Sequence, residues 1–203
     1  MIAIIDYGVG NLFSLVSSFK AIGVDTVITG DIETIKKADK LILPGVGAFG
    51  DAIKKLRETS LDKVLIEQAK NGKPVMGICL GMQMLFEKSY EYGEHEGLGL
   101  LKGEVVPMEN RLPENLKIPH IGWNALIFKK ENPLFKYINN GDCVYFVHSY
   151  YAEGCDDSLL ATAEYGKELT AAVAKGNIYG CQFHPEKSGN VGLNILKAFC
   201  EME

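Results

Sequence analysis

The sequence predicts an α/β fold with a mostly parallel central sheet flanked by helices, and with additional antiparallel strands in its C-terminal half. Two observations indicate this fold class. The first 90 residues alternate short, continuously apolar runs with amphipathic helical segments, which is typical of a parallel sheet covered on both faces. After about residue 100, short strand-like runs follow one another through turn-rich pieces, which favours antiparallel strands. No repeat, low-complexity tract or linker interrupts the chain, so we expect a single domain over residues 1–203.

The parallel strands are expected at four short apolar runs in the first half of the chain. These runs are Ile2–Ile5, Val24–Thr29, Lys40–Leu43 and Pro74–Ile78. Between the first two strands, Asn11 can cap a helix whose apolar residues keep helical spacing from Leu12 to Ile22, and Gly23 ends it. Two more helical segments are predicted near Asp51–Arg57 and over Leu61–Lys70.

The second half is expected to add short strands and one closing helix. The predicted strands are Glu104–Pro107, Ala125–Phe128, Cys143–Val147, Leu159–Glu164, Ala171–Ala174 and Ile178–Phe183. The helix is predicted from Gly189 to Met202, with an apolar face centred on Ile195, Leu196 and Phe199.

Composition excludes several classes of function. A net charge of -5 with no basic run argues against a nucleic-acid surface. The N-terminus lacks the features of a signal peptide and no apolar run could span a membrane, so we expect a cytoplasmic protein with reduced cysteines. We expect Cys143, Cys181 and Cys200 in the core.

No spacing of His, Cys and carboxylates fits a metal site, and Phe13 leaves the dinucleotide-type pattern after Gly8 incomplete. Neither metal nor cofactor is therefore expected.

The sharpest local pattern is Gly77-Ile78-Cys79-Leu80-Gly81, which follows an apolar strand and precedes a helical segment. This is the arrangement of a nucleophile elbow, in which a tight turn projects the central side chain at the carboxyl edge of the sheet. The helix N-terminus there would stabilise a thiolate. A buried structural cysteine in a glycine-rich turn is the alternative reading.

A thiol nucleophile needs a residue that manages its proton, and His184 is the best placed of four histidines. It follows a predicted strand directly and is followed by Pro185, which forces an extended backbone. His184 and Glu186 would then point the same way, so that Glu186 could orient the imidazole.

Acyl transfer also requires donors for an oxyanion. The N–H of Leu80 is one by elbow geometry. The turn Pro44-Gly45-Val46-Gly47 ends the third predicted strand at the same edge, so that the N–H of Val46 or Gly47 could supply the other.

Together these motifs resemble the class I (triad) glutamine amidotransferases, and the resemblance runs over essentially the whole chain. Within the class the sequence is most similar to the glutaminase subunits of imidazole glycerol phosphate synthases. The segments that carry this closer similarity are Ile4–Leu12, Pro119–Asn124 and Tyr145–Tyr150.

The resemblance implies a role for each matching residue. Cys79 would attack the glutamine amide, His184 would act as acid and then base, and Glu186 would orient His184. Residues that would bind glutamine are Gly47, Gln83 and the backbone of Ser149 and Tyr150. The ammonia would pass to a separate (β/α)₈ cyclase subunit near Asn11, Trp123, Asn124 and Lys187.

Other functions fit the same motifs. The chain could serve another synthase, or act alone as a Cys-His-Glu peptidase or γ-glutamyl hydrolase. It could also be a non-catalytic binding subunit, although a pure binder has no physical need for a complete triad.

Overall fold

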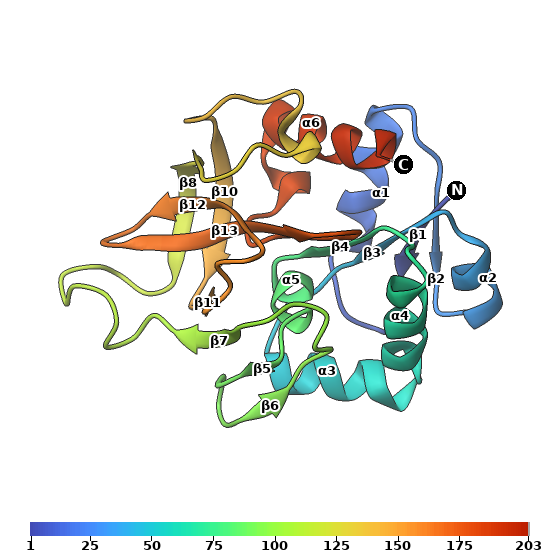
Figure 1. The fold of residues 1–203 in the computed structure, drawn as a ribbon, viewed down its shortest axis with the longest axis horizontal. Coiled ribbons are helices and arrows are strands. Elements are labelled where there is room, and N and C mark those ends of the chain that lie inside the picture. Colours follow the sequence, from blue (N-terminus) through green and yellow to red (C-terminus); the bar gives the residue numbers. More distant parts are fainter. Residues whose placement is uncertain (203) are drawn as a thin grey trace.

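A computed structural model describes residues 1–202, and its centre is an eight-stranded sheet (Figure 1). Five strands run parallel, in the spatial order β2 (Thr26–Thr29), β1 (Ile2–Ile5), β3 (Lys40–Leu43), β4 (Val75–Ile78) and β14 (Ile178–Cys181). Three antiparallel strands continue the sheet, in the order β13 (Glu168–Lys175), β12 (Leu159–Glu164) and β9 (Ile127–Phe128). The predicted fold class is therefore confirmed.

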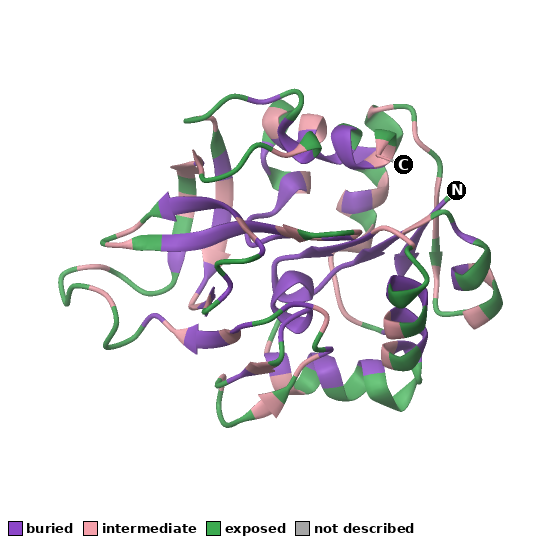
Figure 2. Ribbon diagram, viewed as in Figure 1, coloured by how far each residue is buried: buried purple, intermediate pink, exposed green. Residues whose placement is uncertain are grey.

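Helices cover both faces of the parallel part. One layer consists of α1 (Leu12–Ala21) and α6 (Gly189–Glu201), and the other of α2 (Ile32–Lys37), α3 (Phe49–Glu58), α4 (Leu61–Lys70) and α5 (Leu80–Met84). Side chains alternate across a strand, so Ala3 and Ile5 of β1 join one core while Ile2 and Ile4 join the other. The inner strands β1 and β4 are buried throughout, whereas the edge strand β2 is partly exposed. The outer helices are buried only on their inner faces (Figure 2), but α5 is buried along its whole length.

Two smaller sheets flank the antiparallel end. One has the order β11 (Tyr150–Glu153), β7 (Glu104–Pro107), β5 (Lys88–Ser89) and β6 (His95–Glu96), and the other pairs β10 (Cys143–His148) with β8 (His120–Ala125). Short 3-10 turns span Pro133–Phe135 and Pro185–Lys187. In the β8–β10 ribbon, Trp123 lies opposite Tyr145 and His120 lies opposite His148, so the two histidines share one face.

Several local predictions were wrong. The run Ala125–Phe128 is not one strand, because β8 ends at Ala125 and β9 begins at Ile127. Cys143 is exposed at the start of β10 rather than in the core, whereas Cys181 is fully buried. Asn11 occupies the N-cap position of α1, but its side chain makes no capping hydrogen bond. The short elements α2, β5, β6 and β11, and all of β8 except Ala125, were not predicted.

The carboxyl ends of β3, β4 and β14 meet at one edge of the sheet, since these three parallel strands are neighbours. The turn after β3 carries Val46 and Gly47, and the turn after β4 carries Cys79. His184 comes shortly after β14. Among residues 1–202, no helix is long and apolar enough to cross a bilayer.

Candidate active site

Cys79 occupies a strained turn between β4 and α5. Its φ of 54° lies in the left-handed region, which a residue with a side chain rarely adopts. Close packing makes the flanking glycines necessary. A Cβ on Gly77 would lie 2.6 Å from the carbonyl oxygen of Gly81, and a Cβ on Gly81 would lie 1.9 Å from that of Leu43. The elbow is thus locked by contacts that no larger residue permits.

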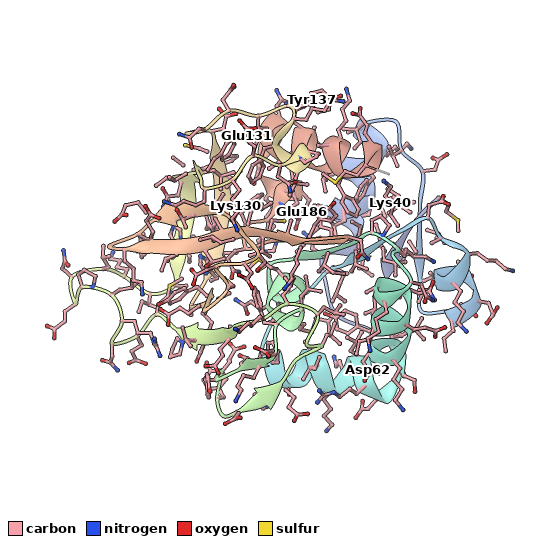
Figure 3. All side chains as sticks on the ribbon, viewed as in Figure 1. Lys40, Asp62, Lys130, Glu131, Tyr137 and Glu186 are labelled. Carbon is pink, nitrogen blue, oxygen red and sulfur yellow. The ribbon has the colours of Figure 1, made fainter. Side chains whose placement is uncertain are left out.

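His184 and Glu186 are held on the segment between β14 and α6, where Figure 3 labels Glu186. The Nδ1 atom of His184 lies 2.8 Å from Oε1 of Glu186, and both side chains are almost completely buried. Ser188 fixes the segment, because its hydroxyl donates to the carbonyl of His184 and accepts from the N–H of Tyr145. Since a carboxylate oxygen accepts, Nδ1 carries the proton and Nε2 is left to face the cysteine.

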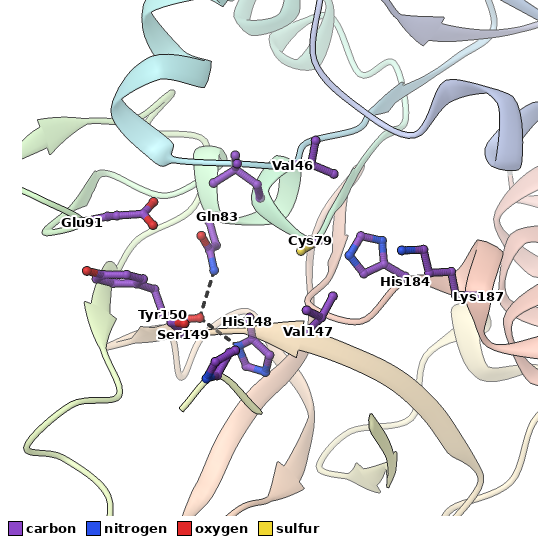
Figure 4. Close-up of a pocket in the computed structure, with 13 residues that line it drawn as sticks. Val46, Cys79, Gln83, Glu91, Val147, His148, Ser149, Tyr150, His184 and Lys187 are labelled. Carbon is purple, nitrogen blue, oxygen red and sulfur yellow. Dashed lines mark hydrogen bonds between the residues drawn. The ribbon is translucent and has the colours of Figure 1, made fainter. Parts of the chain in front are cut away.

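The three residues meet beside a cavity of about 330 Å³. Figure 4 shows the sulfur of Cys79 beside the imidazole of His184 at one end of this cavity. The residues that line it are Val46, Gly47, Cys79, Leu80, Gln83, Glu91, Pro119, Val147, His148, Ser149, Tyr150, His184 and Lys187. Glu186 does not line the cavity and reaches it only through His184.

The surroundings of His184 favour its charged form. Burial lowers the pKa of the imidazole, but hydrogen bonds with Cys79 and Glu186, together with their negative charges, outweigh burial and raise the pKa to about 9. The imidazole of His184, which lies between the thiol of Cys79 and the carboxylate of Glu186, is therefore protonated near neutral pH. This arrangement can supply a thiolate nucleophile and an acid for a leaving group.

Gln83 is buried in the site rather than exposed on its helix. Its Nε2 donates to the carbonyl of Tyr150 and to Oε1 of Gln182, both at 3.0 Å. Both amide hydrogens are thereby used, and Oε1 remains as the acceptor. Gln182 in turn places its Nε2 3.8 Å from the sulfur of Cys79.

Glu91 is a residue of the cavity that the sequence analysis missed. It lies across the cavity from Cys79, beyond Gln83 (Figure 4). One carboxylate oxygen accepts the N–H of Phe49 at the start of α3, at 2.6 Å, and burial raises the pKa of the group. Glu91 follows the short strand β5, which carries no motif, so only the folded chain shows its position.

The other predicted site residues fall into two groups. Val46, Gly47 and Leu80 line the cavity with Cys79, as do Ser149, Tyr150 and Lys187. Outside it, Trp123 is 58% exposed, whereas Asn124 is half-buried and bonds to His120 and to the carbonyl of Glu164. Asn11 is also half-buried, at the start of α1. Over the described part of the chain, no three His, Cys, Asp or Glu residues are grouped to hold a metal ion.

The class of protein follows from this site and fold together with one comparison. A family model described as glutamine amidotransferase class-I matches residues 3–202. A solved structure described as PurLQS from Thermotoga maritima has the same fold, with a TM-score of 0.75 at 20% identity, covering 98% of this chain and 96% of that one. The chain belongs to the class-I glutamine amidotransferases.

Curated relatives identify the family to which the chain belongs within this class. The imidazole glycerol phosphate synthase subunit HisH of Caldanaerobacter subterraneus subsp. tengcongensis is 54% identical over 203 residues, which cover 100% of this chain and 98% of that protein. The protein of the same name from Lactococcus lactis subsp. lactis is 53% identical over 201 residues, with 98% of each covered. Within its class, the chain belongs to the family of imidazole glycerol phosphate synthase subunit HisH.

Proposed function

We propose that this chain hydrolyses glutamine through Cys79 and delivers the ammonia to a cyclase subunit that makes imidazole glycerol phosphate for histidine biosynthesis. The observation that carries the proposal is the meeting of Cys79 and His184 in one cavity, with Glu186 bonded to the far side of the imidazole at 2.8 Å. Family membership and the identity with curated relatives over the whole chain support the same function.

The reaction would proceed by two acyl transfers. The thiolate of Cys79 attacks the side-chain amide carbon of glutamine, and the oxyanion is held by the N–H of Leu80 with that of Val46 or Gly47. His184 donates its proton to the departing nitrogen, which leaves as ammonia and gives a thioester. His184 then takes a proton from water, which attacks the thioester and releases glutamate. The sum is glutamine plus water to glutamate plus ammonia.

The opposite end of the cavity suits the amino-acid end of glutamine. Glu91 supplies a negative charge for the α-ammonium group, and Oε1 of Gln83 supplies a further acceptor. The carbonyls of Ser149 and Tyr150 already accept from Met108, Gln83 and His148. This segment would therefore contact the substrate through its other groups.

A partner would dock at the mouth of the cavity. Ile121 and Trp123 are each 58% exposed on one face of β8, opposite Val147 and Tyr145 of β10. Val147 also lines the cavity, so the exposed apolar face continues into the site. Exposed aromatic groups of this kind serve as interface anchors. We propose that the (β/α)₈ cyclase subunit covers this face together with Lys187, Asn11 and Asn124, and that both subunits act in the cytoplasm.

Ammonia release from glutamine tests the proposal, measured with and without the cyclase subunit and its phosphorylated ribulosyl ligand. We expect stimulation by the loaded partner. Cys79→Ala should abolish hydrolysis but still form the complex, whereas the exposed Cys143→Ala should behave as the unmodified chain. Hydrolysis that persists in Cys79→Ala would refute the role of this residue. Stimulation by a different synthase, or full activity without a partner, would instead favour one of the other enzymatic functions.

A further inference from the structure

Two histidines that the proposed chemistry does not use lie at the wall of the substrate cavity: His148 lines the cavity, and His120 contacts His148 without lining it. The Nδ1 atom of His148 lies 2.9 Å from the carbonyl oxygen of Tyr150, and its Nε2 lies 3.0 Å from Nδ1 of His120. Both rings are buried, and burial lowers the pKa of His120 to about 4 and that of His148 to about 3. The pair is therefore neutral at physiological pH.

The geometry fixes where the protons of this pair lie. A carbonyl oxygen only accepts, so Nδ1 of His148 carries a proton and its Nε2 is the acceptor. The proton between the rings then belongs to Nδ1 of His120. The remaining Nε2 of His120 accepts from the amide of Asn124 at 3.3 Å. In this series of hydrogen bonds, which runs from Asn124 through the two histidines to the carbonyl of Tyr150, every donor points toward Tyr150.

The same carbonyl sets the direction of a second series of bonds that ends at the reactive sulfur. Gln83 donates one Nε2 hydrogen to Tyr150 and the other to Oε1 of Gln182. A reversed Gln83 amide would bring its oxygen against both of these oxygen atoms. Because Gln182 must accept from Gln83, its own Nε2 is turned toward Cys79, 3.8 Å from the sulfur.

We propose that Gln182 is a further active-site residue, whose amide donates a hydrogen bond to the sulfur of Cys79 and stabilises the thiolate. Gln83 and His148 are positioning residues that fix the direction of this donation through the carbonyl of Tyr150. The inference rests on the proposed function, in which this sulfur is the nucleophile. Gln182 is fully buried, so its donor acts without competition from water.

Alkylation of the native protein by iodoacetamide tests the donation without any need for glutamine. Mass spectrometry would follow the modification of Cys79 and of the exposed Cys143, which serves as the reference within each sample. Gln182→Met keeps the shape of the side chain but removes the donor, and Gln182→Glu sets an anionic oxygen against the sulfur. We expect the Cys79 to Cys143 rate ratio at pH 7 to fall about five-fold in the first variant and at least about ten-fold in the second.

The positioning role is tested by a rescue. His148→Leu removes the donor to Tyr150, whereas His148→Asn retains an amide N–H near the place of Nδ1. We expect the leucine variant to slow alkylation of Cys79 and the asparagine variant to restore it in large part. Val144→Ala, at a fully buried position on the same strand, is the matched control for lost packing and should leave the ratio unchanged.

The outcomes of these experiments distinguish a failure of the inference about Gln182 from a failure of the proposed function. If the unmodified chain hydrolyses glutamine but Gln182→Met alkylates at the normal ratio and turns over normally, the inference is overturned. If the unmodified chain hydrolyses no glutamine even with its partner, the proposed function fails, yet the alkylation ratios still report on the donor. Should Gln182→Met fail to fold, Gln182→Glu and the His148 variants carry the test. Ring ¹⁵N spectra showing either His120 or His148 as the Nε2–H tautomer would also overturn the proposed direction.

Discussion

Replacing Glu186 by glutamine separates the effect of the charge of this carboxylate, in the proposed triad, from the effect of its shape. In the structure Oε1 of Glu186 accepts from Nδ1 of His184, while Oε2 is buried with no hydrogen-bond partner among the described residues. Glutamine can keep its oxygen at the first position and place its NH₂ group at the second. The Glu186→Gln variant should therefore retain the orientation of the imidazole and lose only the negative charge.

The expected loss in kcat/KM follows from the strength of the neutral hydrogen bond that would remain between His184 and the glutamine at position 186. A hydrogen bond to a charged group contributes about 1.5–3 kcal/mol and a neutral one about 0.5–1.5 kcal/mol, so the charge accounts for about 1–2 kcal/mol. Solvent does not screen this pair, because the two side chains are 4% and 2% exposed. At about 1.4 kcal/mol for each factor of ten, kcat/KM should fall roughly 5- to 30-fold. The newly buried NH₂ group should also lower the stability of the fold by about 1 kcal/mol or more.

Steady-state glutamine hydrolysis in the presence of the cyclase subunit measures the effect on activity. Glu94→Gln provides a matched control, since it removes the charge of a glutamate whose side chain is 61% exposed and which pairs with Lys88 at the surface. That variant should keep normal kcat/KM. If Glu186→Gln also kept normal kcat/KM, an electrostatic role for Glu186 would be excluded. A loss as complete as that of Cys79→Ala would show that orientation had been lost as well.

Three further predictions concern the fold and the cavity. Gly81→Ala should lower the free energy of unfolding by more than about 3 kcal/mol in urea titrations, because its Cβ would lie 1.9 Å from the carbonyl of Leu43; normal stability would contradict the packing of the elbow. The pKa of His184, raised from 6.5 to about 9, means that the folded state binds this proton more tightly than the unfolded state. The protonated imidazole therefore stabilises the fold fully below pH 6.5, and this stabilisation of about 3 kcal/mol is lost as pH rises through 9. Urea unfolding at several pH values measures the loss. A free energy of unfolding that rises with pH over this range would contradict the prediction. Glu91→Gln should raise KM for glutamine about ten-fold with little change in kcat, whereas an unchanged KM would remove Glu91 from the substrate site.

The elbow and the parallel strands could be predicted because their causes are local in sequence. Ile2–Ile5 and Leu41–Leu43 are continuously apolar because both faces of the sheet are covered there, and the predicted bounds agree with β1 and β3. Gly77 and Gly81 indicate the elbow in the sequence, because at both positions neighbouring backbone lies too close to leave room for a side chain. A structural constraint between residues that are close in sequence can therefore be recognised in a short sequence motif.

Short or exposed elements escaped prediction because their conformation depends on distant partners. The strand β5 is two residues long and exists because Lys88 and Ser89 pair with both β6 and β7. Cys143 lies in a run that reads as apolar, but it begins an edge strand and faces solvent. Its residue type alone does not say which face of that strand is covered.

The sequence by itself determined the fold class and was enough to predict the three residues of the proposed triad, since the tight turn and the His-Pro-Glu segment are each encoded within a few residues. Only the tertiary structure decided which other groups share the cavity. Glu91 lies on a loop without a motif, and the amide of Gln182 is turned toward Cys79 by a carbonyl more than thirty residues away along the chain. The direction of a hydrogen bond depends on what stands on both sides of it, and the chain brings those groups together only when it folds.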